Sequence, residues 1–336
     1  MAARVTLHVG LMKSGTTFIQ GLLYANRQRL ADRGVLVPGE HWGEQVDAVK
    51  DVLRPQEGSG AWSRLTREIA AWPGDAVVSM EFLGPAKPRA LQRVVRSLRP
   101  ARVEVVVSVR DLNRSIVALW QETIQNGRWW TWEEYVAGVR AVRPDSADGP
   151  LTEAGRTFWR QQHAARVCAA WAEVADACTL VTVPPPGADR NTLTARFGEA
   201  AGFPVEGLVP PTQGNESIGA ASTLALRRMN ELLAERGLPF PQGSRIRKQV
   251  LAKQVMAAQR DAEPRIGLPV EDWVRATAGW MTGELSRSGV RLVGEWGDLE
   301  PVAVPGIDPA TVPPAAVAEA AAGGLAGLVA FQIGQP

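Results

Sequence analysis

Four short apolar runs, separated by stretches with helical spacing, most constrain what this chain can fold into. The runs cover residues 5–9, 76–80, 103–109 and 179–183. Runs of this length are typical of buried strands. Helices are expected between them, at residues 18–33, 88–98, 113–126 and 157–175. Strands that alternate with helices form right-handed crossovers and a parallel sheet. We therefore expect an α/β fold with three layers, a parallel sheet flanked by helices.

The first apolar run leads into a glycine-rich turn of sequence GLMKSGTT and then into the first expected helix. Such a turn makes an anion site, because backbone N–H groups converge there and the helix dipole adds positive potential. Lys13 supplies a mobile cation, Ser14 and Gly15 follow it, and Thr16 and Thr17 supply hydroxyl donors at the start of the helix. The pattern predicts that these five residues bind a phosphate-like group.

The order of residues in this turn distinguishes between nucleotide-binding families. A Walker A loop has the pattern GxxxxGK[ST], whereas here Gly15 follows Lys13 and the loop is shorter. The order Lys-Ser-Gly-Thr-Thr resembles instead the 5′-phosphosulfate loop of sulfotransferases, which use 3′-phosphoadenosine 5′-phosphosulfate (PAPS). This resemblance implies a P-loop-like fold in which the turn cradles the 5′-phosphate and Lys13 contacts the phosphosulfate bridge, with no metal required.

A second segment resembles the element of sulfotransferases that holds the 3′-phosphate. In that family a strand ends in Arg, and a helix follows with a Ser eight residues further on. Here the run 103–109 ends at Arg110, but the position eight residues on is Ala118. Ser115 lies one helical turn earlier, and Arg114 precedes it. The resemblance implies that Arg110 binds the 3′-phosphate through its planar guanidinium, with Ser115 and Arg114 as further contacts.

Sulfuryl transfer is an in-line displacement, so the acceptor needs a base and the leaving oxygen needs positive charge. In sulfotransferases the base is usually a His or Glu just past the strand that follows the loop. Glu81, directly after residues 76–80, stands in that place. The carboxyl ends of parallel strands share one edge of a sheet, so we expect Glu81, Arg110 and Lys13 to converge. His41, in the loop-rich stretch after the first helix, is the alternative base.

The composition excludes several other classes of protein. The chain has 37 basic and 35 acidic residues and no basic stripe, which argues against a nucleic-acid partner. Cys168 and Cys178 do not form a CxxC pair, and three scattered histidines do not suggest a metal site. The N-terminal segment lacks the long apolar stretch of a signal peptide. We expect a cytoplasmic protein with no membrane partner.

We expect residues 1–300 to form a single sulfotransferase-like domain that becomes helical from about residue 215, with helices at 222–236, 244–260 and 270–288. Residues 301–336 contain no Lys or Arg and are rich in Ala, Gly and Pro. This composition favours a disordered tail, and its apolar stretch is too short and too rich in Gly to span a membrane.

The sequence indicates less about the acceptor than about the donor. Trp129, Trp130 and Trp132 are candidates to line a cleft for a small-molecule or glycan acceptor, although buried aromatic residues more often form cores. The sequence does not distinguish a hydroxyl from an amine acceptor. Two other functions stay open. One is a P-loop nucleotide kinase-like phosphotransferase; the other is a non-catalytic nucleotide-binding member of the fold, because Ala118 replaces the expected Ser.

Overall fold

The computed structural model describes residues 2–55, 58–142, 152–189, 191–211 and 217–334. The chain divides into two compact units, each made of three stretches. The sheet unit contains Met1–Asp111, Arg160–Asn215 and Ala278–Glu300; the helical unit contains Leu112–Trp159, Glu216–Thr277 and Pro301–Pro336. The chain leaves the sheet unit directly after its fourth strand and returns to it twice, and the expected single domain over residues 1–300 stays a prediction.

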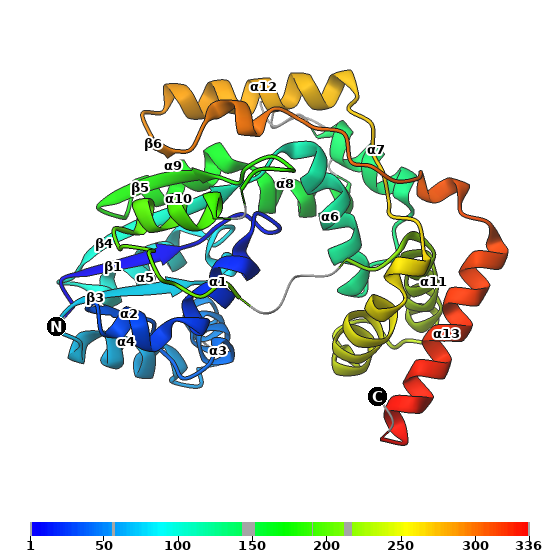
Figure 1. Ribbon diagram of the computed structural model, residues 1–336, viewed down its shortest axis with the longest axis horizontal. Coiled ribbons are helices and arrows are strands. Elements are labelled where there is room, and N and C mark those ends of the chain that lie inside the picture. Colours follow the sequence, from blue (N-terminus) through cyan, green and yellow to red (C-terminus); the bar gives the residue numbers. More distant parts are fainter. Residues whose placement is uncertain (1, 56–57, 143–151, 190, 212–216, 335–336) are drawn as a thin grey trace. The chain divides into compact units, whose positions relative to one another are not determined.

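A six-stranded parallel sheet forms the centre of the sheet unit. The strands are β1 (Arg4–His8), β2 (Val35–Leu36), β3 (Asp75–Ser79), β4 (Arg102–Val109), β5 (Ala177–Thr182) and β6 (Arg291–Val293). Their order in the sheet is β2-β3-β1-β4-β5-β6 (Figure 1). The four predicted runs are the four inner strands, so the α/β prediction is confirmed. The two short edge strands were not predicted.

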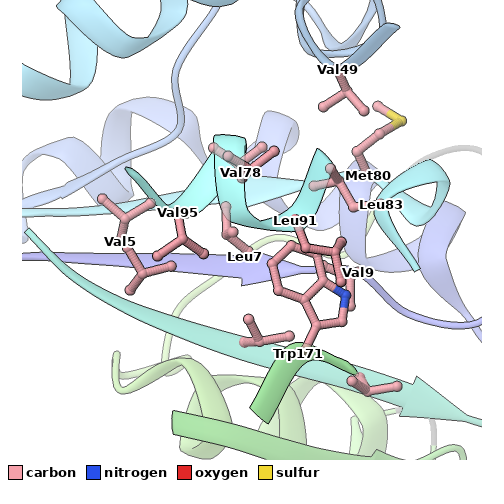
Figure 2. Packing of buried hydrophobic residues seen from close by; sticks show 14 of the residues in the cluster. Val5, Leu7, Val9, Val49, Val78, Met80, Leu83, Leu91, Val95 and Trp171 are labelled. Carbon is pink, nitrogen blue, oxygen red and sulfur yellow. The ribbon is translucent and has the colours of Figure 1, made fainter. Parts of the chain in front are cut away.

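One face of the sheet carries the larger hydrophobic core of this unit. Val5, Leu7 and Val9 are fully buried on this face, because alternate residues of a strand point the same way (Figure 2). Trp171 packs into the same cluster. The helices that cover this face are α3 (Trp42–Leu53), α4 (Ala61–Ala71), α5 (Pro88–Leu98) and α9 (Ala164–Ala172).

The opposite face is covered by three helices, which are α1 (Thr16–Ala25), α2 (Arg27–Ala31) and α10 (Thr192–Ala201). Ile19 of α1 and Phe197 of α10 pack there with Val106 of β4 in a second cluster of buried residues. His8 also lies on this face, with its ring edge-to-face against Phe197 at a centroid distance of 5.0 Å. The sheet unit therefore has the three expected layers.

The helical unit has a core of aromatic side chains. Its main elements are α6 (Leu112–Gln125), α7 (Trp132–Ala141), α8 (Glu153–Gln162), α11 (Ala220–Glu235), the π-helix η3 (Arg245–Met256) and α13 (Pro314–Gln332). The helix α12 (Asp272–Arg287) continues from this unit into the sheet unit, as does the end of α8. Trp120 and Trp132 meet edge-to-face at 5.1 Å, and Phe158 contacts both Tyr135 and Trp159. The described residues also contain short 3-10 helices in both units, which are η2 (Glu81–Leu83), η4 (Arg260–Ala262), η5 (Trp296–Leu299) and η6 (Pro309–Thr311).

Two predicted helices are each broken by one polar residue. The helix expected over residues 18–33 breaks at Asn26, whose side chain donates to Val209 O at 2.7 Å and accepts from Val209 N at 2.8 Å. The helix expected over residues 157–175 breaks at His163, whose ring accepts the backbone N–H of Arg166 at the start of α9. The stretch expected to be rich in loops contains α3 and α4 instead.

The structure also differs from the sequence prediction at residues 301–336, where a disordered tail was expected. The structure has the 19-residue helix α13 there, packed against α11 and η3. Alanine has a high helix propensity, and Pro314 is tolerated in the first turn. Gly327 permits the contact with η3, because a Cβ there would lie 2.2 Å from a methyl of Val255. By length and composition alone, α13 is the one helix among the described residues that could cross a membrane, with a mean hydropathy of 1.5, so the expectation that this stretch is too short to do so was wrong.

Replacing Leu7, at the centre of the sheet, should destabilise the whole sheet unit. Leu7 is fully buried, so Leu7→Ala leaves a cavity and should lower the free energy of unfolding by about 2–5 kcal/mol. Leu325→Ala is the matched control, because Leu325 is 65% exposed and its truncation should change stability by less than about 0.5 kcal/mol. Urea unfolding followed by fluorescence measures both, and equal losses would contradict this view of the core.

Candidate functional site

The glycine-rich turn lies between β1 and α1, at the carboxyl edge of a central strand. Lys13 has a φ of 65°, the only positive φ at a non-glycine position in the described part of the chain. Gly15, with a φ of 79°, is the N-cap of α1, and no side chain caps this helix. A left-handed non-glycine residue costs about 1–3 kcal/mol and is found mostly at functional sites. The backbone of the turn thus has two left-handed positions, at Lys13 and Gly15, directly before α1, and its predicted binding of an anion stays a prediction.

Hydrogen bonds to β4 hold this turn in place. The N–H of Leu11 donates to Ser108 O at 2.9 Å, and the hydroxyl of Ser14 donates to the same oxygen at 2.8 Å. Ser14 is fully buried, and its hydroxyl also contacts Leu11 O. Gln162 donates to Met12 O at 2.8 Å. In this structure the Ser14 hydroxyl joins the loop to β4, and its predicted contact with a ligand stays a prediction.

Arg110 and Glu81 lie at the ends of the two strands that flank β1. The Nη1 of Arg110, just past β4, lies 3.4 Å from the carbonyl oxygen of Lys13 and donates to it. Glu81 begins η2, just past β3. Because β3, β1 and β4 are neighbours, Glu81, Lys13 and Arg110 all follow adjacent strands at one edge of the sheet.

Gln20 holds Glu81 against α1, and the sequence analysis missed it. Its Nε2 donates to Glu81 Oε2 at 2.7 Å and to Ser79 O at 3.3 Å. Gln20 is 5% exposed. A polar residue within the apolar sequence of α1 was the signal that could have singled it out.

The other predicted site residues have different surroundings. His41 is the N-cap of α3, and its side chain is 72% exposed with Nε2 at 3.9 Å from the Glu44 carboxylate. This contact joins the N-cap of α3 to the first turn of the same helix. Arg114 and Ser115 belong to α6 in the helical unit, where Ser115 is buried.

The two threonines of the turn differ in exposure. Thr16, the first residue of α1, is buried, whereas Thr17 is exposed. Their predicted roles toward a ligand stay predictions, like those of Arg114 and Ser115.

The tryptophans proposed for the acceptor have three different environments in the helical unit. Trp132 is buried in the aromatic core. Trp130 lies beneath the Arg128 guanidinium, 5.2 Å from ring centroid to Cζ, in a cation–π contact. Trp129 is 39% exposed. Of these three tryptophans, Trp129 and Trp130 are therefore the two that are not buried.

Burial sets the charge of His8. The ring is fully buried, and desolvation lowers the pKa of His8 from 6.5 to about 3. Its ring contacts are Ser79, Ser108 and Phe197, none of which carries a charge. The imidazole is neutral at physiological pH. Among the described residues, no group of three or more His, Cys, Asp or Glu side chains is placed to hold a metal ion.

Comparison with known proteins finds structural likeness of low similarity. No family model matches this chain, and no curated protein matches it. Among solved structures, a crystal structure of a sulfotransferase from Alicyclobacillus acidocaldarius is 13% identical, with a TM-score of 0.41, over 77% of this chain and 100% of that chain. A likeness this distant does not by itself indicate a function.

The buried histidine should make the fold sensitive to mild acid. The folded pKa of His8 lies below the unfolded value of 6.5, so the unfolded state binds the proton first and stability falls as the pH drops below about 6.5. The loss should approach about 1.4 kcal/mol per pH unit between roughly pH 6 and 5. His8→Gln should remove this slope, and His41→Gln, at an exposed histidine, should retain it. Urea unfolding at stepped pH values measures the slopes, and a wild-type slope equal to that of His8→Gln would contradict the assignment.

Proposed function

We propose that this chain transfers the sulfuryl group of PAPS to a hydroxyl or amine of a small-molecule or glycan acceptor. The observation that carries the proposal is the turn with Lys13 at φ 65°, at the sheet edge where Glu81 and Arg110 also lie. The residue order of that turn resembles the phosphosulfate loop of sulfotransferases, and the parallel sheet gives it the setting that such loops require.

The turn would act on the donor and its leaving group. The backbone N–H groups at the start of α1 would bind the 5′-phosphate, and the helix dipole favours negative charge there. Lys13 contributes a full positive charge. As the bond between sulfur and the bridging oxygen breaks, negative charge collects on the 5′-phosphate, and these groups stabilise it.

Glu81 would act on the acceptor. The acceptor oxygen or nitrogen attacks sulfur, its proton passes to the Glu81 carboxylate, and the products are the sulfated acceptor and 3′-phosphoadenosine 5′-phosphate (PAP). Gln20 donates to Oε2 of Glu81 at 2.7 Å, which restrains the carboxylate, and the other oxygen would receive the proton of the acceptor. A fixed base saves the entropy of orienting it in the transition state.

Arg110 would bind the 3′-phosphate, with Arg114 and Ser115 as additional contacts. A guanidinium can bind two phosphate oxygens at once, which distinguishes a 3′-phosphorylated nucleotide from ATP or ADP. Ser115 takes the role that Ala118 cannot, one helical turn away. Trp129 and Trp130 offer apolar surface to a bulky acceptor.

Nucleotide binding tests the donor assignment. We expect calorimetric titration to show PAP binding at least roughly tenfold tighter than ADP or ATP, because charge-assisted bonds to a phosphate contribute more than neutral ones. Arg110→Ala should remove this preference. Arg102→Ala, at the opposite end of the same strand, should retain it. If PAP does not bind the wild-type protein, the assignment is wrong, and magnesium-dependent ATP turnover would favour the kinase-like alternative.

Transfer assays test the catalytic roles. With labelled PAPS and a panel of phenols, amines and glycans, Lys13→Ala and Glu81→Ala should reduce transfer by roughly 10²-fold or more while the fold survives. Lys50→Ala, at an exposed position of α3, is the control and should be fully active. Full activity of Glu81→Gln would exclude Glu81 as the base. PAP binding without transfer to any acceptor would favour the non-catalytic alternative.

A further inference from the structure

A buried cluster of polar side chains connects the proposed phosphate loop to the strands β1, β3 and β4. It consists of His8, Ser14, Ser79 and Ser108, which are each 2% exposed or less. The Nδ1 of His8 lies 2.7 Å from Ser79 Oγ, and its Nε2 lies 3.0 Å from Ser108 Oγ. Ser108 Oγ lies 3.0 Å from Ser14 Oγ. These contacts form one chain of hydrogen bonds from β3 through β1 and β4 to the loop.

Each end of this chain is next to a residue of the proposed site. Ser79 is the last residue of β3, two positions before Glu81, and Ser108 is two positions before Arg110. Ser14 follows Lys13 and is the loop residue that the chain reaches. The His8 ring is therefore the central connection between the strand ends that carry the proposed base, the lysine and the arginine.

The chemistry of the cluster suits a rigid connection. A neutral imidazole has one donor and one acceptor. Because the Ser14 hydroxyl donates to Ser108 O, the chain is continuous when the Ser108 hydroxyl donates to Ser14 Oγ, Nε2 of His8 donates to Ser108 Oγ, and Nδ1 accepts from the Ser79 hydroxyl. A protonated ring would carry two donors and no acceptor. Gly10 leaves room for the cluster: a Cβ there would lie 2.2 Å from Ser108 Oγ and 2.9 Å from His8 Nε2.

We propose that His8 is a positioning residue, which through Ser79 and Ser108 holds the loop and its two flanking strand ends in the geometry that binds the donor nucleotide. The inference rests on the proposed function for its ligand, but the mechanical role of His8 concerns the loop itself. His8 touches neither nucleotide nor acceptor. It acts by removing freedom from the Lys13 backbone, which is held in the left-handed region.

The first experiment measures the loop without any nucleotide. In His8→Phe the ring still packs on Phe197 but loses both nitrogens, and amide hydrogen exchange over residues 11–17 should speed up by roughly tenfold or more, while β4 stays protected. Thr6→Val is the matched control: Thr6 is buried on the same strand and face, outside the cluster, and its loss should leave loop exchange unchanged. Exchange in His8→Phe equal to that of wild type would overturn the proposal.

The second experiment connects the loop to the nucleotide. PAP affinity should fall by roughly tenfold or more in His8→Phe, and His8→Gln, whose amide restores one donor and one acceptor, should recover part of it. Ser108→Ala and Gly10→Ala should both loosen the same loop, and they test the proposal if His8→Phe does not fold. PAP affinity equal to that of wild type in every one of His8→Phe, Ser108→Ala and Gly10→Ala that folds would overturn the proposal. If the wild-type protein binds no PAP, the proposed function fails, whereas loop exchange still decides the role of His8.

Discussion

The pairing of β1 with β3 on one side and β4 on the other is the constraint on which the rest of the site depends. Parallel pairing brings the ends of all three strands to one edge. Leu7, in the middle of β1, is buried in the core on one face of the sheet. A slip of one residue in the register would turn Leu7 to the opposite face and lose this packing. Lys13, Glu81 and Arg110 therefore follow strand ends whose positions are fixed by hydrophobic packing within the sheet.

Much of this arrangement could be predicted from the sequence, because it depends on local pattern. The inner strands are continuous apolar runs, and buried parallel strands have that composition. Once the order of strands and helices is known, Glu81 and Arg110 are expected at the edge that carries the loop. The two outer strands, of two and three residues, are too short to have a recognisable pattern. They form because β3 and β5 offer unpaired backbone groups at the edges of the sheet.

The features that could not be predicted depend on contacts between distant segments. Asn26 ends a helix because the backbone of Val209 lies beside it, which no local pattern contains. Gln20 reaches Glu81 only after α1 has packed on the sheet. In α13 the composition suggested disorder, yet Gly327 fits a close contact with η3 that a larger residue would prevent. In each case tertiary contact decides between alternatives that local propensity leaves open.

The buried cluster is consistent with the proposed site in a chain of almost neutral charge. A net charge of +2 offers no broad attraction for a nucleotide, so the proposed binding would depend on a few groups held accurately. An aliphatic residue could replace His8 with no loss of burial. The hydroxyls of Ser79 and Ser108 would then lose the ring as a partner, and buried polar groups without partners destabilise a fold. An imidazole between Ser79 and Ser108 satisfies them and also fixes their direction. Because the imidazole is neutral, the positive charge of the proposed site would come from Lys13, Arg110 and the backbone N–H groups.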